Sequence, residues 1–146
     1  MANIVFNVAL GRLAYYADLP AAADELIMVP LAATGLPTDG TMRDYTTLAA
    51  VKGGATEQTN LGRKTLANVT VTVDQANDRV NLDADDVTWT ATSGAAIGAV
   101  VICYKPDASS TDAQIIPLTK HDVNMTPDGS DFTLTISDFA RATSAA

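Results

Sequence analysis

The sequence predicts a mainly β protein, folded as a β-sandwich or jelly-roll-like single domain over residues 1–146. Asp occurs 15 times, Glu twice and Thr 19 times. Asp favours turns and Thr favours strands, whereas Glu favours helix interiors. Short apolar runs also recur about every 8–12 residues with turn residues between them, which is typical of sandwiches and barrels. A chain of 146 residues, 47% apolar, is long enough to bury one core without disulfides or metals.

The first segment, residues 4–16, is predicted to form a strand bent at Gly11. Apolar side chains occupy every second position in its first half, which is the period of a strand. A strand that enters a helix is the alternative, because the period does not separate the two. Tyr15 and Tyr16 would point to opposite sides of a strand, so we expect one of them to be exposed at an interface.

A buried strand is predicted at Leu26–Val29, because the run is short, fully apolar and followed by Pro30. The Pro/Gly-rich residues 35–40 that come next read as a loop. Leu36 and Pro37 in this loop are further candidates for an interface.

One short helix is predicted over about residues 41–52. Thr41 could cap it, with Asp44 three residues later as a weak capping box. Gly53-Gly54 would end it. The apolar residues at helical spacing are Met42, Tyr45, Leu48 and Ala49.

From residue 63 onward the pattern predicts strands, and the tail over residues 141–146 is expected either to be flexible or to contact a neighbour. The predicted strands are 66–73, 79–82, 87–89, 97–104, 115–118 and 132–136. The apolar run 97–104 is expected to be central and covered on both faces. One core is expected to contain Trp89, Val101, Cys103 and Phe132.

The residues that carry chemistry are few. His121 is the only histidine, and we expect it on a loop or the surface, with no nucleophile motif to partner it. Cys103 lies inside the most apolar strand, where a cysteine behaves as a small buried hydrophobe. The sequence has no phosphate-binding glycine loop and predicts no cofactor and no enzymatic activity.

The net charge and the apolar runs of the chain indicate which classes of partner to expect. A net charge of -8 and a pI near 4.3 argue against binding to nucleic acid, which requires clustered Lys and Arg. No apolar run approaches the roughly 20 residues of a membrane helix, and no signal peptide is visible. The sequence therefore predicts neither a nucleic-acid nor a membrane partner.

One cluster of aspartates and one tryptophan each have both a functional and a structural interpretation. Asp83, Asp85 and Asp86 could supply oxygen ligands to a metal, but their spacing is not that of a calcium loop. Turn formation is the interpretation we favour, and calcium should not be required. Trp89 could be a platform for sugars, although its alternation with Thr88 and Thr90 favours a core position.

Several segments of the chain are informative when they are taken together, namely residues 9–31, 75–79, 85–91, 98–104, 112–119 and 126–131. In sequence and in order, these segments resemble small structural proteins encoded among the head genes of tailed bacteriophages, especially those of actinobacteria. The similarity covers nearly the whole chain and concerns structural signatures rather than a catalytic motif.

This resemblance implies a virion structural protein, made in the host cytoplasm, that acts as a capsid decoration (cement) protein. Its partner would be the major capsid protein. A homotrimer is expected, since icosahedral shells offer threefold positions and joined copies gain avidity. The alternative is a virion tail or adhesion protein, or a carbohydrate-binding β-sandwich module.

Overall fold

The structure is a computed structural model, and it describes residues 3–144. It confirms the mainly β prediction: the strands form three sheets, and every pairing is antiparallel. The largest sheet has the order β1-β8-β7-β2-β3. Its strands are β1 (Ile4–Val5), β2 (Glu25–Ala32), β3 (Lys64–Thr65), β7 (Ile97–Lys105) and β8 (Ile116–Met125).

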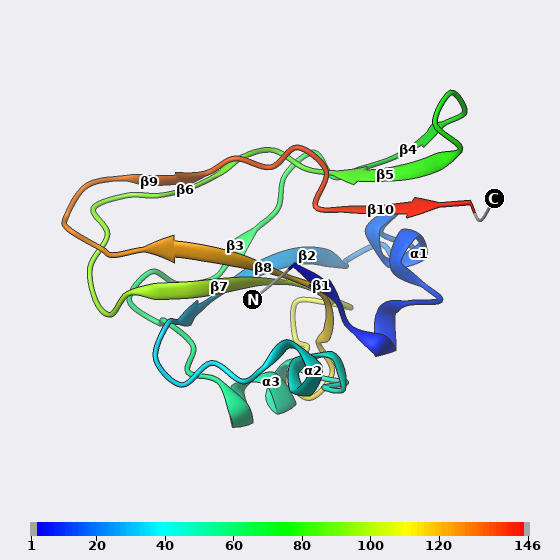
Figure 1. Ribbon diagram of the computed structural model, residues 1–146. Helices are drawn as coiled ribbons and strands as arrows, with labels where there is room; N and C mark the ends of the chain where they lie inside the picture. Colours follow the sequence, from blue (N-terminus) through cyan, green and yellow to red (C-terminus); the bar gives the residue numbers. More distant parts are fainter. Residues whose placement is uncertain (1–2, 145–146) are drawn as a thin grey trace.

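Two smaller sheets cover one face of this sheet, and two helices cover the other (Figure 1). The smaller sheets have the orders β10-β5-β4 and β6-β9. Their strands are β4 (Thr70–Asp74), β5 (Arg79–Asp83), β6 (Val87–Trp89), β9 (Phe132–Leu134) and β10 (Ala140–Thr143). The helices are the 3-10 helix η1 (Asn7–Ala9), α1 (Leu13–Ala17), α2 (Asp39–Arg43) and α3 (Leu48–Gly54).

The central strand β7 explains this layered arrangement. Successive side chains of a strand point to opposite faces, and nearly all those of β7 are apolar and buried. Val100 and Ile102 therefore pack beneath the small sheets, whereas Val101 and Cys103 pack against α2 and α3. The prediction of a central strand covered on both faces is confirmed.

The same alternation corrects the expectation of a single core around Trp89 and Cys103. Both side chains are buried, but they belong to two clusters on opposite faces of the large sheet. Val101 lies with Cys103. Phe132 is only partly buried and lies with Trp89, where the two rings stack with their centroids 5.9 Å apart.

The prediction of one strand over residues 4–16 is wrong. Only two residues pair with β8, as β1, and the chain then turns through η1 into α1. The second half of the segment is helical, and its apolar side chains at helical spacing form the one buried face of α1. These are Leu13, Tyr16 and Ala17.

The expectation that Pro30 stops the second strand is also wrong, since β2 continues to Ala32. Pro30 pairs with Val100 of β7, and its carbonyl oxygen accepts a hydrogen bond from the Gln58 N–H at 2.8 Å. In an antiparallel strand the N–H and C=O of one residue point to the same side. The missing donor of Pro30 therefore faces the loop at Gln58, and the ladder to β7 loses no bond.

The single helix predicted over about residues 41–52 is two helices, α2 and α3. Each begins at a threonine that sequence analysis did not assign as a cap: Thr38 Oγ1 accepts from the Thr41 N–H, and Thr47 Oγ1 accepts from the Ala50 N–H. A second cap in the middle of the window ends one helix and starts the next. The expectation that Gly53-Gly54 end the helix is wrong, because α3 continues through both glycines and its C-cap residue is Ala55.

The C-terminal segment is more ordered than predicted. Residues 140–143 form β10, which pairs with β5, so this part of the expected tail is a strand. Residues 145 and 146 of that tail lie outside the described residues. The strand predicted over residues 66–73 is shorter in the structure, because β4 begins at Thr70, and Val73 near its end is 66% exposed.

Lys120 is the one cation buried in the large sheet, among the residues that the structure describes. It lies in β8 between Ile4 of β1 and Val101 of β7, and it is 1% exposed. Its Nζ lies 2.7 Å from Asp39 Oδ1 and 2.6 Å from Asp122 Oδ1. Because Asp39 is the first residue of α2, this ion pair fastens the helix to the sheet.

We predict that Lys120→Met destabilises the protein strongly. Removing one partner of a buried ion pair leaves uncompensated charge and typically costs about 3–5 kcal/mol. The triple variant K120M/D39N/D122N should recover most of that loss, because neutral groups of similar size do not require a counter-ion. Urea denaturation measures both, and a K120M variant as stable as the wild type would contradict this account.

Candidate functional site

The structure separates the four residues predicted for an interface. Tyr15 is 58% exposed on α1, whereas its neighbour Tyr16 is buried and packs on Tyr104 with ring centroids 4.6 Å apart. Leu36 and Pro37 are half-buried in the loop before α2. A Cβ on Gly98 would lie 2.6 Å from Leu36 Cδ1, so this leucine packs against β7. Tyr15 is thus the most accessible of the four.

Trp89 does not present a face to solvent. It is 2% exposed, and its indole Nε1–H donates to the carbonyl oxygen of Gly62 at 3.0 Å. Its ring stacks on Phe132 of the paired strand. A sugar platform requires an exposed aromatic face, which this tryptophan lacks.

The three aspartates considered as metal ligands bind other parts of the chain. Asp83 Oδ1 accepts from the backbone N–H groups of Ala84 and Asp138, at 2.9 and 3.1 Å. Asp86 Oδ1 accepts from the backbone N–H of Ile136, and Asp85 Oδ2 accepts from the Asn68 amide. Within residues 3–144 no group of three or more His, Cys, Asp or Glu side chains is placed to hold a metal ion.

These bonds give Asp83 and Asp86 a structural role: they hold the segment between β9 and β10. Asp138 in that segment has φ of 103°, a conformation that costs energy for any residue except glycine. Its N–H is bound by Asp83, and its Oδ2 accepts from Arg141 Nε at 2.8 Å. Contacts on both sides therefore hold the strained backbone in place.

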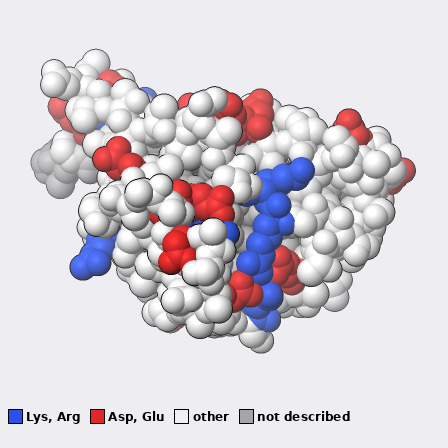
Figure 2. All heavy atoms as spheres, turned by 180° about the vertical axis from the view of Figure 1, so that it is seen from behind, with Lys and Arg blue, Asp and Glu red and all other residues white. Residues whose placement is uncertain are grey.

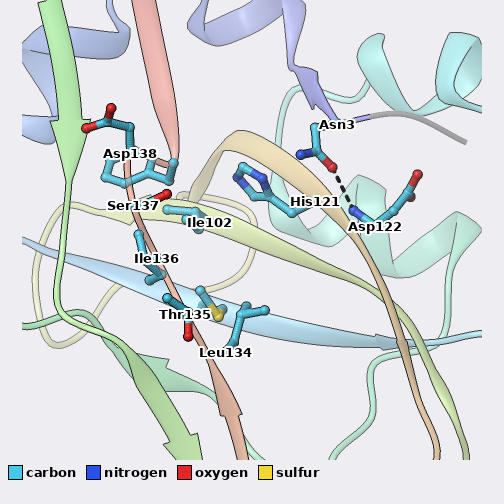
Figure 3. Close-up of a pocket in the computed structure, with 11 residues that line it drawn as sticks. Asn3, Ile102, His121, Asp122, Leu134, Thr135, Ile136, Ser137 and Asp138 are labelled. Carbon is cyan, nitrogen blue, oxygen red and sulfur yellow. Dashed lines mark hydrogen bonds between the residues drawn. The ribbon is translucent and has the colours of Figure 1, made fainter.

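A cavity of about 220 Å³ lies between this segment and the large sheet (Figure 3). Met28 and Ile102 form part of its apolar wall, and Ser137 and Asp138 line the opposite side. His121 projects into it from β8, so the expectation of a loop or surface histidine is wrong. The cavity combines an apolar wall with a few polar groups but is smaller than ordinary small-molecule sites.

The chemistry available to His121 is limited by its contacts. Burial lowers the pKa of His121, the nearby charge of Lys120 lowers it further, and Asp122 opposes the shift. The ring is therefore neutral at neutral pH. Its Nε2 lies 2.9 Å from Thr119 Oγ1 of the same strand, which fixes the ring orientation. This contact holds the histidine in the wall of the cavity.

Cys103 likewise lacks the setting of a reactive thiol. It is fully buried, and this burial raises the pKa of the thiol well above its ordinary value. A nucleophilic cysteine requires a lowered pKa and access to solvent.

A charge network on the surface was not predicted from the sequence. Arg63 binds Glu57 through Nε at 2.7 Å and Asp112 through Nη1 at 2.7 Å. Lys52 of α3 lies 2.7 Å from Asp112 and 3.1 Å from Glu57. These four residues join the end of α3, the loop before β3 and the loop between β7 and β8. The face seen from behind shows basic and acidic side chains that lie side by side (Figure 2).

The network also lowers the pKa values of its two carboxyl groups. The hydrogen bonds from Arg63, and then those from Lys52, lower the pKa of Asp112 to about 2. The pKa of Glu57 is lowered for the same reason, first by Arg63. No sequence signal could have found this set, because Asp112 is 49 residues from Arg63 and 60 from Lys52.

Comparison of the chain with protein-family models, curated proteins and solved structures found no match. Within the described part of the chain, no helix is long and apolar enough to cross a membrane.

We predict that acidification below pH 6.5 destabilises the protein through His121. The ordinary pKa of histidine is 6.5 and the folded value is lower, so the unfolded chain binds the proton more readily. The free energy of unfolding should therefore fall as the pH drops through this window. His121→Gln should flatten that dependence, measured by denaturant titration at several pH values. An unchanged slope in the variant would show that another group is responsible.

A second prediction concerns Arg63→Ala at lower pH. Carboxylates with lowered pKa values stabilise the fold above their ordinary pKa of about 4, and this contribution is lost as the pH falls toward 2. The variant should lose about 2 kcal/mol at neutral pH, and its acid unfolding should begin at a higher pH. Lys64→Ala, which removes a neighbouring charge outside the network, is the control. Equal effects of the two substitutions would contradict the role of the network.

Proposed function

We propose that the protein is a bacteriophage virion structural protein that acts as a capsid decoration protein. It would bind the major capsid protein on the outside of the head shell as a homotrimer and so stabilise the shell. The observation that carries this proposal is the resemblance of nearly the whole chain to small virion structural proteins encoded among phage head genes.

The structure supports this proposal through the form of the molecule. A protein that clamps a shell acts through rigid surfaces, and here the ion pairs of Lys120 and Arg63 fasten helices and loops to a continuous β core. The polar residues considered for chemistry are engaged in holding the chain: Asp83 and Asp86 bind backbone N–H groups, and Trp89 binds Gly62.

The charge of -8 affects how such a protein would meet a shell. Contacts with an acidic shell must be mainly apolar or main-chain, or must match local basic patches. Tyr15 is an exposed side chain suited to such a contact. Added salt should weaken a contact of this kind only modestly, because screening acts on exposed charges.

Copy number in the particle tests the proposal. Densitometry or quantitative mass spectrometry of purified virions that contain this chain should give a number of copies close to that of the major capsid protein. Tail proteins of the same particles, present in few copies, provide the internal reference. A count that matches those tail proteins would overturn the decoration role and favour the tail or adhesion alternative.

A further inference from the structure

The exposed large apolar side chains gather at one end of the molecule. Among the described residues these are Leu10, Tyr15 and Val73, which are 64%, 58% and 66% exposed. Leu10 and Tyr15 line a hollow that reaches Ala142 of β10, and Val73 lines a second hollow that also reaches Ala142. The three side chains thus belong to one continuous surface around the exposed Ala142.

The first hollow is basic. It has a volume of about 420 Å³, and its charged lining residues are Arg12 and Arg141, with no acidic residue among those that line it. Arg141 pairs with Asp138, whereas Arg12 is exposed and makes no ion pair within the described residues. This is an unusual setting in a chain with 17 acidic and 9 basic residues.

The second hollow has the opposite character. Asp74 and Asp78 line it together with Arg79 and Val73. Asp74 is paired with Arg79, whereas Asp78 is exposed at the turn of the β4–β5 hairpin. An accessible acidic group therefore lies beside an exposed valine on this side of Ala142, and an accessible arginine lies beside an exposed leucine and tyrosine on the other.

The backbone at this end is also available. β10 is the edge strand of its sheet and follows β5 in the order β10-β5-β4. The β4–β5 hairpin and β10 extend past the large sheet on the side where α1 lies (Figure 1). An edge strand offers unpaired N–H and C=O groups to another chain.

We propose that this surface binds a second copy of the same chain. Cyclic symmetry brings one patch of a molecule against a different patch of its neighbour, or both patches against each other around a twofold axis. The two hollows flank one small residue and carry complementary charge beside apolar side chains. With Ala142 nearest the symmetry axis, the Val73 and Asp78 side of one copy meets the Leu10, Arg12 and Tyr15 side of the next.

The self-complementarity favours this occupant over a shell subunit, since one chain supplies both the basic and the acidic half. This inference names the surface that joins the copies of the proposed homotrimer. It rests on the proposed function only for the number of copies, three. Self-association is measured on the isolated protein, so its failure is distinct from failure of the copy-number test on virions.

The test is sedimentation equilibrium of the full chain over a range of concentrations. The wild type should form a closed oligomer. Tyr15→Ser and Val73→Ser should each raise the dissociation constant about tenfold or more, because exposed apolar anchors at an interface carry much of its energy. Arg12→Gln and Asp78→Asn should weaken it as well, whereas Arg43→Gln, an equal change of charge on the exposed side of α2, should leave it unchanged.

Cross-linking checks the contact directly. The native Cys103 is fully buried, so introduced cysteines have no competing exposed thiol among the described residues. A mixture of Tyr15→Cys and Val73→Cys chains should form a disulfide-linked pair under mild oxidation, and neither variant alone should do so to the same extent. A wild type that sediments as a monomer at all concentrations would overturn the proposal, as would an oligomer that the four surface variants leave intact. If the four surface variants kept self-association but lost binding to capsid shells, the surface would belong to the contact with a capsid subunit. That outcome would also overturn the proposal.

Discussion

The structure depends on one constraint: the strand β7 is apolar on both faces and must be covered on both. Val100 and Ile102 require one layer, and Val101 and Cys103 require another. Neighbouring strands β2 and β8 complete the sheet, but they cannot cover its faces. The helices α2 and α3 therefore pack on one side, and the small sheets with α1 pack on the other. Most of the remaining architecture follows from this division.

The charged residues adapt to the same constraint. Lys120 lies in β8 on the helical side, where apolar neighbours leave it no water, and Asp39 of the covering helix neutralises it. His121, the next residue, points to the opposite face and is held neutral by burial in the wall of a cavity. Arg63 joins the loop at Glu57 to the loop at Asp112 through its ion pairs with both carboxylates. Charge in this protein thus fastens layers and loops together.

The sequence predicted the features that depend on local periodicity. The strands β5, β6 and β7 follow from the alternation of apolar side chains, which neighbouring residues determine. Prediction from the sequence failed where contacts between residues far apart in the chain determine the secondary structure. The burial of Tyr16 against Tyr104 favours a helix at α1, and pairing with β5 turns the expected tail into β10. It also placed Trp89 and Cys103 in one core, because periodicity assigns a residue to a face but does not say which layer covers it.

The candidate surface was even less accessible to sequence reasoning. The sequence predicted that either Tyr15 or Tyr16 would be exposed, but Arg12 and Val73 became relevant only when the fold placed their segments beside β10. Charge complementarity of this kind is a property of surfaces, and the chain order separates its two halves by about 60 residues.

Hydrogen exchange on dilute and on concentrated protein tests most directly where this molecule makes its contacts. Amides of β7 should exchange slowly at both concentrations, because the strand is central and covered on both faces. Association should slow exchange at residues 10–15, in the β4–β5 hairpin and in β10, while the loop over residues 33–38 stays unchanged. Protection that appeared at residues 33–38 instead, with none around β10, would contradict the account.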